Sequence, residues 1–118
     1  MGGSLQGFEL SLSKEVTILA GTGSSGSANG TGTSASFNNP TGITTDGTNL
    51  YVGDRDNHLI RKIVISTGVV TTVAGTGSSG SANGTGTSAS FSAPYGIAID
   101  GTNLYVGDTD NNLIRQIE

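Results

Sequence analysis

The sequence contains no cysteine and no tryptophan, and only 12% of its residues are charged. Without cysteine, the chain can form neither a disulfide framework nor a thiolate zinc site, and it indicates no redox compartment. No apolar run approaches the roughly 20 residues that a membrane-spanning helix needs. The N-terminus has neither the basic nor the apolar region of a signal peptide. We therefore expect no membrane partner, and for the chain as written only a cytoplasmic location.

Basic residues are also scarce, with five Lys and Arg against nine Asp and Glu and a net charge of −4. Binding to a phosphate backbone depends on clustered Lys and Arg. No two aromatic residues are spaced so that bases could stack between them. The composition therefore argues against nucleic acid as a partner.

Glycine is abundant, at 20 of 118 residues, and it is interspersed with Ser, Thr and Asn between short runs of Val, Ile, Leu and Tyr. Alternating short apolar runs and turn-forming residues are typical of many short strands joined by turns. The composition predicts an all-β fold without substantial helices.

The chain consists of two nearly identical units at an offset of 54 residues. Val16 opens a unit that begins again at Val70, and the block 20–37 recurs unchanged as 74–91. Roughly three quarters of the aligned positions are identical without a gap. Identity that extends through the loops indicates a recent duplication or deliberate design, and a fixed repeat of this length is typical of a repeat architecture.

Each unit carries the signals of an antiparallel meander. In the first unit we predict strands at residues 42–45, 49–53, 59–65 and 69–74. Asp46-Gly47 is a strong hairpin signal, whereas Pro40 is expected to precede the first strand, because proline is excluded from a central ladder. Four short strands in about 40–50 residues are typical of one blade of a β-propeller.

Several motifs resemble those of the NHL-repeat family. Residues 54–62 contain the triplet Asn-His-Leu, the first strand begins Pro-x-Gly-Ile, and the second reads Asn-Leu-Tyr-Val-x-Asp. Residues 70–77 also look like a blade ending of bacterial NHL proteins, whereas the second unit has Asn112 in place of the histidine. The resemblance covers about residues 15–118 and implies a β-propeller. It says little about function, because propellers host many unrelated activities.

Two blades alone would leave two broad apolar faces uncovered, so we expect the ring to be completed by other copies of the chain. Head-to-tail contacts that close under rotation achieve this. The family resemblance favours six blades and hence a homotrimer, with an eight-blade homotetramer as the alternative. Residues 16–20 are expected to act as the outer strand of the neighbouring subunit's second blade, which hides an open strand edge. The expected closure residues are Val16, Ile18, Leu113 and Ile117.

This organisation predicts three segments: a leader at 1–15, a shared outer strand plus the first blade at 16–74, and a connecting loop plus the second blade at 75–118. In the leader, Phe8, Leu10 and Leu12 alternate with polar residues, a pattern typical of a half-buried strand. The leader is therefore an additional outer strand or, alternatively, an expression tag.

No motif indicates a catalytic, cofactor or metal site. Residues 21–26 match G-x-G-x-x-G, but no helix follows to hold a pyrophosphate. His58 is the only histidine, too few for a zinc site, and we interpret it as a solvated turn residue. Acidic motifs in the turns lack the later ligands of a calcium loop. We interpret their Asp side chains as acceptors for turn amides and the Asn residues as left-handed turn positions. These structural turn residues are Asp54, Asn57, Asp108 and Asn111.

The long loops at 21–39 and 75–92 are expected on one rim of the propeller, where binding residues concentrate. The candidate ligand-facing residues of this rim are Asn29, Arg55, His58, Asn83, Tyr95 and Asn112. The sequence therefore predicts a non-catalytic module that assembles with itself. A module that presents these loops to a carbohydrate or a peptide, with weak affinity, is the alternative.

Overall fold

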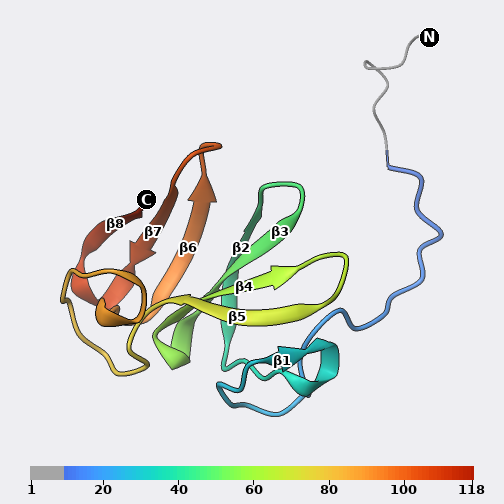
Figure 1. Cartoon of the computed structure of the whole chain (residues 1–118), viewed down its shortest axis with the longest axis horizontal. Helices are drawn as coiled ribbons and strands as arrows, with labels where there is room; N and C mark the ends of the chain where they lie inside the picture. Colours follow the sequence, from blue (N-terminus) through green and yellow to red (C-terminus); the bar gives the residue numbers. More distant parts are fainter. Residues whose placement is uncertain (1–9) are drawn as a thin grey trace, which may run out of the picture.

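The computed structural model describes residues 10–118 and is all-β, as expected (Figure 1). Short 3-10 turns, labelled η, are the only helical elements in that range. In chain order the elements are β1 (Gly30–Thr31), η1 (Gly32–Ser34), β2 (Pro40–Thr45), β3 (Asn49–Asp54), η2 (Arg55–Asn57), β4 (Leu59–Val64), β5 (Val69–Ala74), η3 (Gly86–Ser88), β6 (Pro94–Ile99), β7 (Leu104–Asp108), η4 (Thr109–Asn111) and β8 (Leu113–Ile117).

The first sheet has the strand order β1-β5-β4-β3-β2, and the neighbouring strands are antiparallel. All four strands predicted for the first unit are present, with ends within two residues of those expected. Strand β2 begins two residues earlier than expected, at Pro40, which is the Cα partner of Asp54. Proline is tolerated there because it is the first residue of an edge strand.

Strand β1 was not expected from the sequence. Gly30 and Thr31 lie within the long loop and pair with Val70 and Val69 of β5. Two residues in a run of Gly, Ser, Thr and Asn carry no alternation of apolar and polar side chains, so no strand signal exists there. This short pairing covers the outer edge of the first blade.

The second sheet has only three strands, in the order β6-β7-β8. Strand β8 is therefore an open edge within this chain. Residues 10–20 form no strand here, and the side chains of Leu10 and Leu12 are exposed. Phe8, the first member of the alternating pattern, lies outside the described residues.

The two sheets pack face to face through one of two apolar clusters. Between the sheets, Ile60 and Ala74 of the first sheet meet Val106 of the second sheet and Phe91 of the loop that precedes it. The other cluster lies on the opposite face of the first sheet and contains Ala35, Val52, Ile63 and Val70, with Ala20, Phe37 and Leu50 packed against it. In Figure 1 the second sheet lies on one side of the first and the segment before β1 on the other. The two blades thus stack as successive blades, and the first blade keeps one face without a neighbour.

Among the described residues, no helix has the length and apolar character needed to cross a membrane.

Candidate functional site

A buried ion pair holds each long loop onto its blade. In the first blade, Nη1 of Arg61 donates to Oδ2 of Asp54 at 2.8 Å, and both side chains are fully buried. The guanidinium also donates to the carbonyl oxygens of Ser36 and Ala28, each at 2.9 Å, and lies 5.0 Å from the ring centre of Phe37. The second blade repeats these contacts with Arg115 and Asp108.

The turn residues act differently from the expectation. Asp54 accepts its backbone hydrogen bond from Asn38 in the long loop at 2.8 Å, not from an amide of the turn that follows. Nδ2 of Asn57 donates to Asp54 and to the carbonyl of Gly26, both at 2.7 Å. The left-handed position is His58, with φ 57°.

The second blade shows the same difference. Ser92 donates its amide hydrogen to Asp108, Asn111 bonds to Asp108 and Gly80, and the left-handed residue is Asn112. The carboxylates therefore bond to the loop 16 residues upstream and the Asn side chains bond to it 31 residues upstream, which local sequence rules cannot anticipate.

Sequence reasoning missed Arg61 and Arg115, although a signal was present. Each arginine interrupts an apolar strand, Leu-Ile-Arg-x-Ile, and follows an aspartate by seven residues in both units. Charged residues in a strand interior are buried only when paired. An arginine at a core-facing strand position predicts a carboxylate partner. The sequence offers two nearby candidates in each unit, and the structure shows that the partner is Asp54 rather than Asp56, and Asp108 rather than Asp110.

The predicted rim residues are mostly engaged in contacts within the chain. Oδ1 of Asn29 accepts from Arg61 at 2.9 Å, and Asn83 accepts from Arg115 at 3.0 Å. Arg55 lies 3.6 Å from the exposed carboxylate of Asp56. Tyr95 and Asn112 are exposed. Through these contacts, Asn29 and Asn83 help to hold the buried arginines in place.

His58 is not the solvated turn residue that we expected. It is half-buried, and its Nδ1 accepts a hydrogen bond of 3.0 Å from the backbone N–H of Ala93. The histidine of the first blade therefore contacts the loop that leads into the second blade.

The exposed carboxylates of the hairpins are turn formers. Oδ1 of Asp46 accepts from the backbone N–H groups of Asn49 and Thr48 at 2.7 and 2.9 Å. These hydrogen bonds, that of Asn49 first, hold the pKa of Asp46 below its usual value, and Asp100 behaves alike. Across residues 10–118, no three His, Cys, Asp or Glu side chains gather as a metal site would require.

The face of the second blade that points away from the first blade is exposed to solvent, whereas the equivalent face of the first blade is covered by the second blade. Ile60 is fully buried between the blades, whereas its repeat equivalent Ile114 is 78% exposed. Leu59 is 6% exposed and its equivalent Leu113 is 44% exposed. Among the described residues, the second unit lacks both a fourth strand and a following blade, and their absence accounts for the difference.

The free face of the first blade shows the complementary difference. Phe91 is 2% exposed in the junction between the blades, whereas its equivalent Phe37 is only half-buried. Ile43 on the same face is 60% exposed. A groove of about 440 Å³ opens on this face, lined by Ile18, Phe37, Ile43 and Leu50 among others. This groove occupies the place where a preceding blade would pack.

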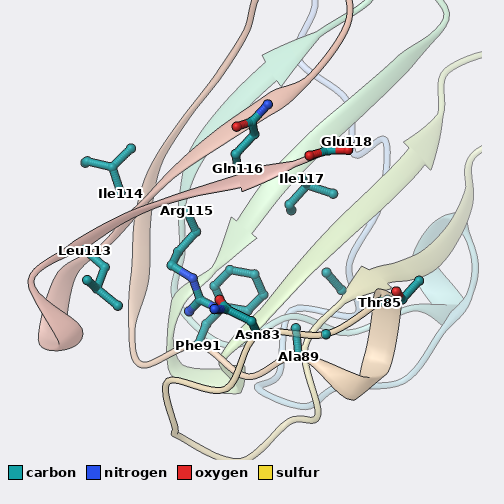
Figure 2. A pocket seen from close by; sticks show the side chains of 13 residues that line it. Asn83, Thr85, Ala89, Phe91, Leu113, Ile114, Arg115, Gln116, Ile117 and Glu118 are labelled. Carbon is teal, nitrogen blue, oxygen red and sulfur yellow. The ribbon is translucent and has the colours of Figure 1, made fainter.

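A second groove, of about 580 Å³, runs along the open edge of β8 (Figure 2). Phe91, Ala89 and Ile117 line it together with the backbone of residues 84–86. Figure 2 shows Arg115 extending toward Phe91, while Ile114 points to the other side of the strand. In the first blade the corresponding space is filled by β5, which lies between β4 and β1. The groove is therefore the position of the missing fourth strand.

The segment that precedes the first long loop has, at each of its two ends, the same backbone features that flank the outer strand β5. The N–H of Gly21 donates to the carbonyl of Gly32 at 3.1 Å, just as Gly75 donates to Gly86 at 3.2 Å after β5.

At the other end of this segment, Lys14 has φ 72°, and its repeat equivalent Gly68 has φ 78°. Glu15 N–H bonds to Oγ of Ser13 at 3.3 Å, as Val69 does to Thr67. Residues 15–20 are thus held between the same two turns as β5. Within residues 10–118 the segment pairs with no strand, and Val16 is 95% exposed.

Comparison with known proteins identifies the family. The model of the NHL repeat matches residues 37–63, which include all of β2 and β3 and most of β4. The chain is 38% identical over 96 residues to Protein SUPPRESSOR OF QUENCHING 1, chloroplastic, of Arabidopsis thaliana and 36% identical over 98 residues to NHL repeat-containing protein 2 of Homo sapiens. These matches cover 79% of this chain but only 9% and 14% of the relatives, so the chain spans a small part of their length.

Solved structures agree with this assignment. An auxiliary nutrient binding protein of Bacteroides ovatus is 32% identical with a TM-score of 0.73, over 80% of this chain and 26% of that one. A structural genomics protein of Bacteroides thetaiotaomicron is 29% identical with a TM-score of 0.77, over 84% and 26%. With two blade-like sheets, the Asn-His-Leu motif and these relatives, the chain belongs to the NHL-repeat β-propeller family.

Proposed function

We propose that this chain is a non-catalytic structural module that assembles head to tail with copies of itself into a closed β-propeller. The observation that carries the proposal is the difference between equivalent residues: Ile60 is fully buried where a blade follows, and Ile114 is 78% exposed where none does. Repeat units are stabilised mainly by contacts with their neighbours. A copy that places the free face of its first blade against Ile114 reproduces the junction already present inside the chain.

Closure by strand exchange completes each subunit boundary. Residues 15–20 lie beside the first blade, whose sheet stands between them and β8 of the same chain, so they serve another copy rather than their own. The register follows from the pairing of β4 with β5, shifted by one repeat. The expected Cα partners between two copies are Ile114 with Ala20, Arg115 with Ile18, Gln116 with Thr17, and Ile117 with Val16.

In this assembly, neither the apolar blade faces nor the open strand edge of a single chain would stay exposed to water. An exposed apolar face of blade size favours association, and an open strand edge favours pairing with another chain. Since each chain contributes two blades, three chains give the six blades favoured by the family resemblance and four chains give eight. We propose the homotrimer first and the homotetramer as its alternative.

A pair of cysteines tests the proposed register in a chain that otherwise has none. Thr17 and Gln116 correspond to Thr71 and Lys62, which are Cα partners across β4 and β5. Paired antiparallel positions lie roughly 4.5–5.5 Å apart, within the range that a disulfide spans. We expect Thr17→Cys with Gln116→Cys to oxidise into covalent rings, seen on a non-reducing gel as a band at three chain masses (or four).

The matched control moves one cysteine out of register, to the exposed turn position Thr102. It should remain mostly uncrosslinked under the same mild oxidation. Equal cross-linking of both variants would show that the disulfide results from random collision, and the strand-exchange proposal would then be wrong.

The binding alternative has less support from the described contacts. An auxiliary nutrient binding protein is among the structural relatives, but the match covers 80% of this chain and only 26% of that protein, which is therefore about three times as long. The rim residues Asn29 and Asn83 already accept hydrogen bonds from Arg61 and Arg115. We therefore give assembly the priority.

A further inference from the structure

We infer that Gly96 and Gly107 are the steric determinants of the junction between two copies, where they receive the backbone of the next copy's residues 40–41. The inference rests on the proposed assembly and identifies which atoms allow it. The Cα of Gly96 lies in the junction inside the chain, but a Cβ on either glycine would not touch that junction. The role that we infer for them follows from their repeat equivalents, Gly42 and Gly53.

Inside the chain, Gly42 and Gly53 let two blades approach at backbone distance. A Cβ on Gly42 would overlap the carbonyl oxygen of Tyr95 and would lie 3.1 Å from the Cα of Gly96. A Cβ on Gly53 would lie 3.0 Å from that same oxygen. Oγ1 of Thr41 donates to the Tyr95 carbonyl at 3.1 Å, which confirms how closely the strands β2 and β6 meet. A side chain at either glycine would force the blades apart.

In the second blade the same positions face open space. No atom outside the neighbouring residues lies within 4 Å of a Cβ built on Gly96, and the nearest atoms to one on Gly107 are 3.8 Å away. Neither residue has a positive φ, so the backbone conformation does not require glycine. Glycine inside a strand is unfavourable relative to alanine. The chain therefore keeps two costly glycines that only an approaching neighbour would need.

The partner atoms follow from the repeat. Tyr95 and Pro94 of the internal junction correspond to Thr41 and Pro40, which are exposed at the free face of the first blade. The next copy's Thr41 carbonyl would therefore lie over Gly96 and Gly107.

A polar contact at the same junction supports this pairing. Inside the chain, the N–H of Ala93 donates to Nδ1 of His58. In the repeat, Ala93 corresponds to Asn39 and His58 corresponds to Asn112, and all four residues have a φ of 57°. The acceptor Oδ1 of Asn and the acceptor Nδ1 of His are both bonded to Cγ. Asn112 can therefore accept the hydrogen bond from Asn39 of the next copy.

The test compares Gly96→Ala with Gly42→Ala by light scattering after size-exclusion chromatography and by circular dichroism. Gly96→Ala is expected to elute at the single-chain mass, at concentrations where the parent chain is fully assembled, and to retain its β-sheet spectrum. Gly42→Ala is expected to lose spectrum and stability as well, because its Cβ clashes inside the chain.

A second variant keeps the inference testable should Gly96→Ala lose its β-sheet spectrum. Asn112→Gly preserves the left-handed backbone and removes the acceptor, and it should raise the concentration needed for assembly by roughly fivefold or more. The inference is overturned if Gly96→Ala assembles like the parent or, in the second case, if Asn112→Gly does. A parent chain that is itself a single-chain species would instead contradict the proposed assembly, so the two failures are distinguishable.

Discussion

Replacement of Asp54 by asparagine is expected to lower the free energy of unfolding by about 3–5 kcal/mol, the cost of leaving one member of a buried ion pair without its partner. The Arg61 guanidinium is fully buried and has Asp54 as its only anionic partner within 4.0 Å among the described residues. Asparagine has nearly the same shape, so the loss would reflect charge rather than a cavity. Since small domains are stable by only about 5–15 kcal/mol, the variant should be close to unfolded.

Urea unfolding at one fixed chain concentration measures this effect, because assembly makes stability depend on concentration. Asp46→Asn is the matched control, since its carboxylate is exposed and the amide oxygen can still accept the hydrogen bonds from Thr48 and Asn49. We expect the control to unfold at nearly the same urea concentration as the parent. If Asp54→Asn changed stability no more than the control, the ion pair would not be what holds the long loop.

Replacement of Ile114 by aspartate is expected to abolish assembly at micromolar concentration without unfolding the chain. Within one chain Ile114 is 78% exposed, so a carboxylate there remains in water. In the proposed junction this side chain takes the place of Ile60, which is fully buried against Phe91 and Val106. An unpaired charge buried in such a cluster costs several kcal/mol, and a ring would bury one at each boundary.

The control for this variant is Ile114→Val, which keeps an apolar side chain and should assemble at nearly the parent's concentration. Ile60→Asp completes the comparison and should unfold the chain, because that position is buried within it. Mass in solution and circular dichroism separate the three outcomes. Full assembly of Ile114→Asp would show that the outward face of the second blade is not an interface.

The strands could be predicted from the sequence because their signals are local. Alternating apolar residues and Asp-Gly turns define β2 to β5, and the exact repeat transfers them to the second blade. The same reasoning failed for β1, whose two residues pair with β5 across some 40 positions of sequence. It also assigned the left-handed position to Asn57 instead of His58. A one-residue error of this kind is inherent in a turn whose length is not fixed by sequence.

The candidate site was predicted only in outline. The prediction that residues 16–20 and the third strand of the second blade meet at a subunit boundary followed from the repeat. The role that we infer for Gly96 did not follow from the sequence. Gly96 and Gly42 occupy equivalent positions of the repeat and differ only in the atoms that surround them in the folded chain. The tasks of Asn29 and His58 were also hidden, since their partners Arg61 and Ala93 lie more than 30 residues away. Long-range contacts of this kind become visible only in the folded chain.

The mass of the parent chain in solution tests the central claim most directly. Light scattering after size-exclusion chromatography at micromolar concentration should give about three times the chain mass of 11.7 kDa, or four times for the eight-blade alternative. A well-folded species of 11.7 kDa that persists across this concentration range would contradict the account, because both bare faces and the open edge of β8 would then be stable in water.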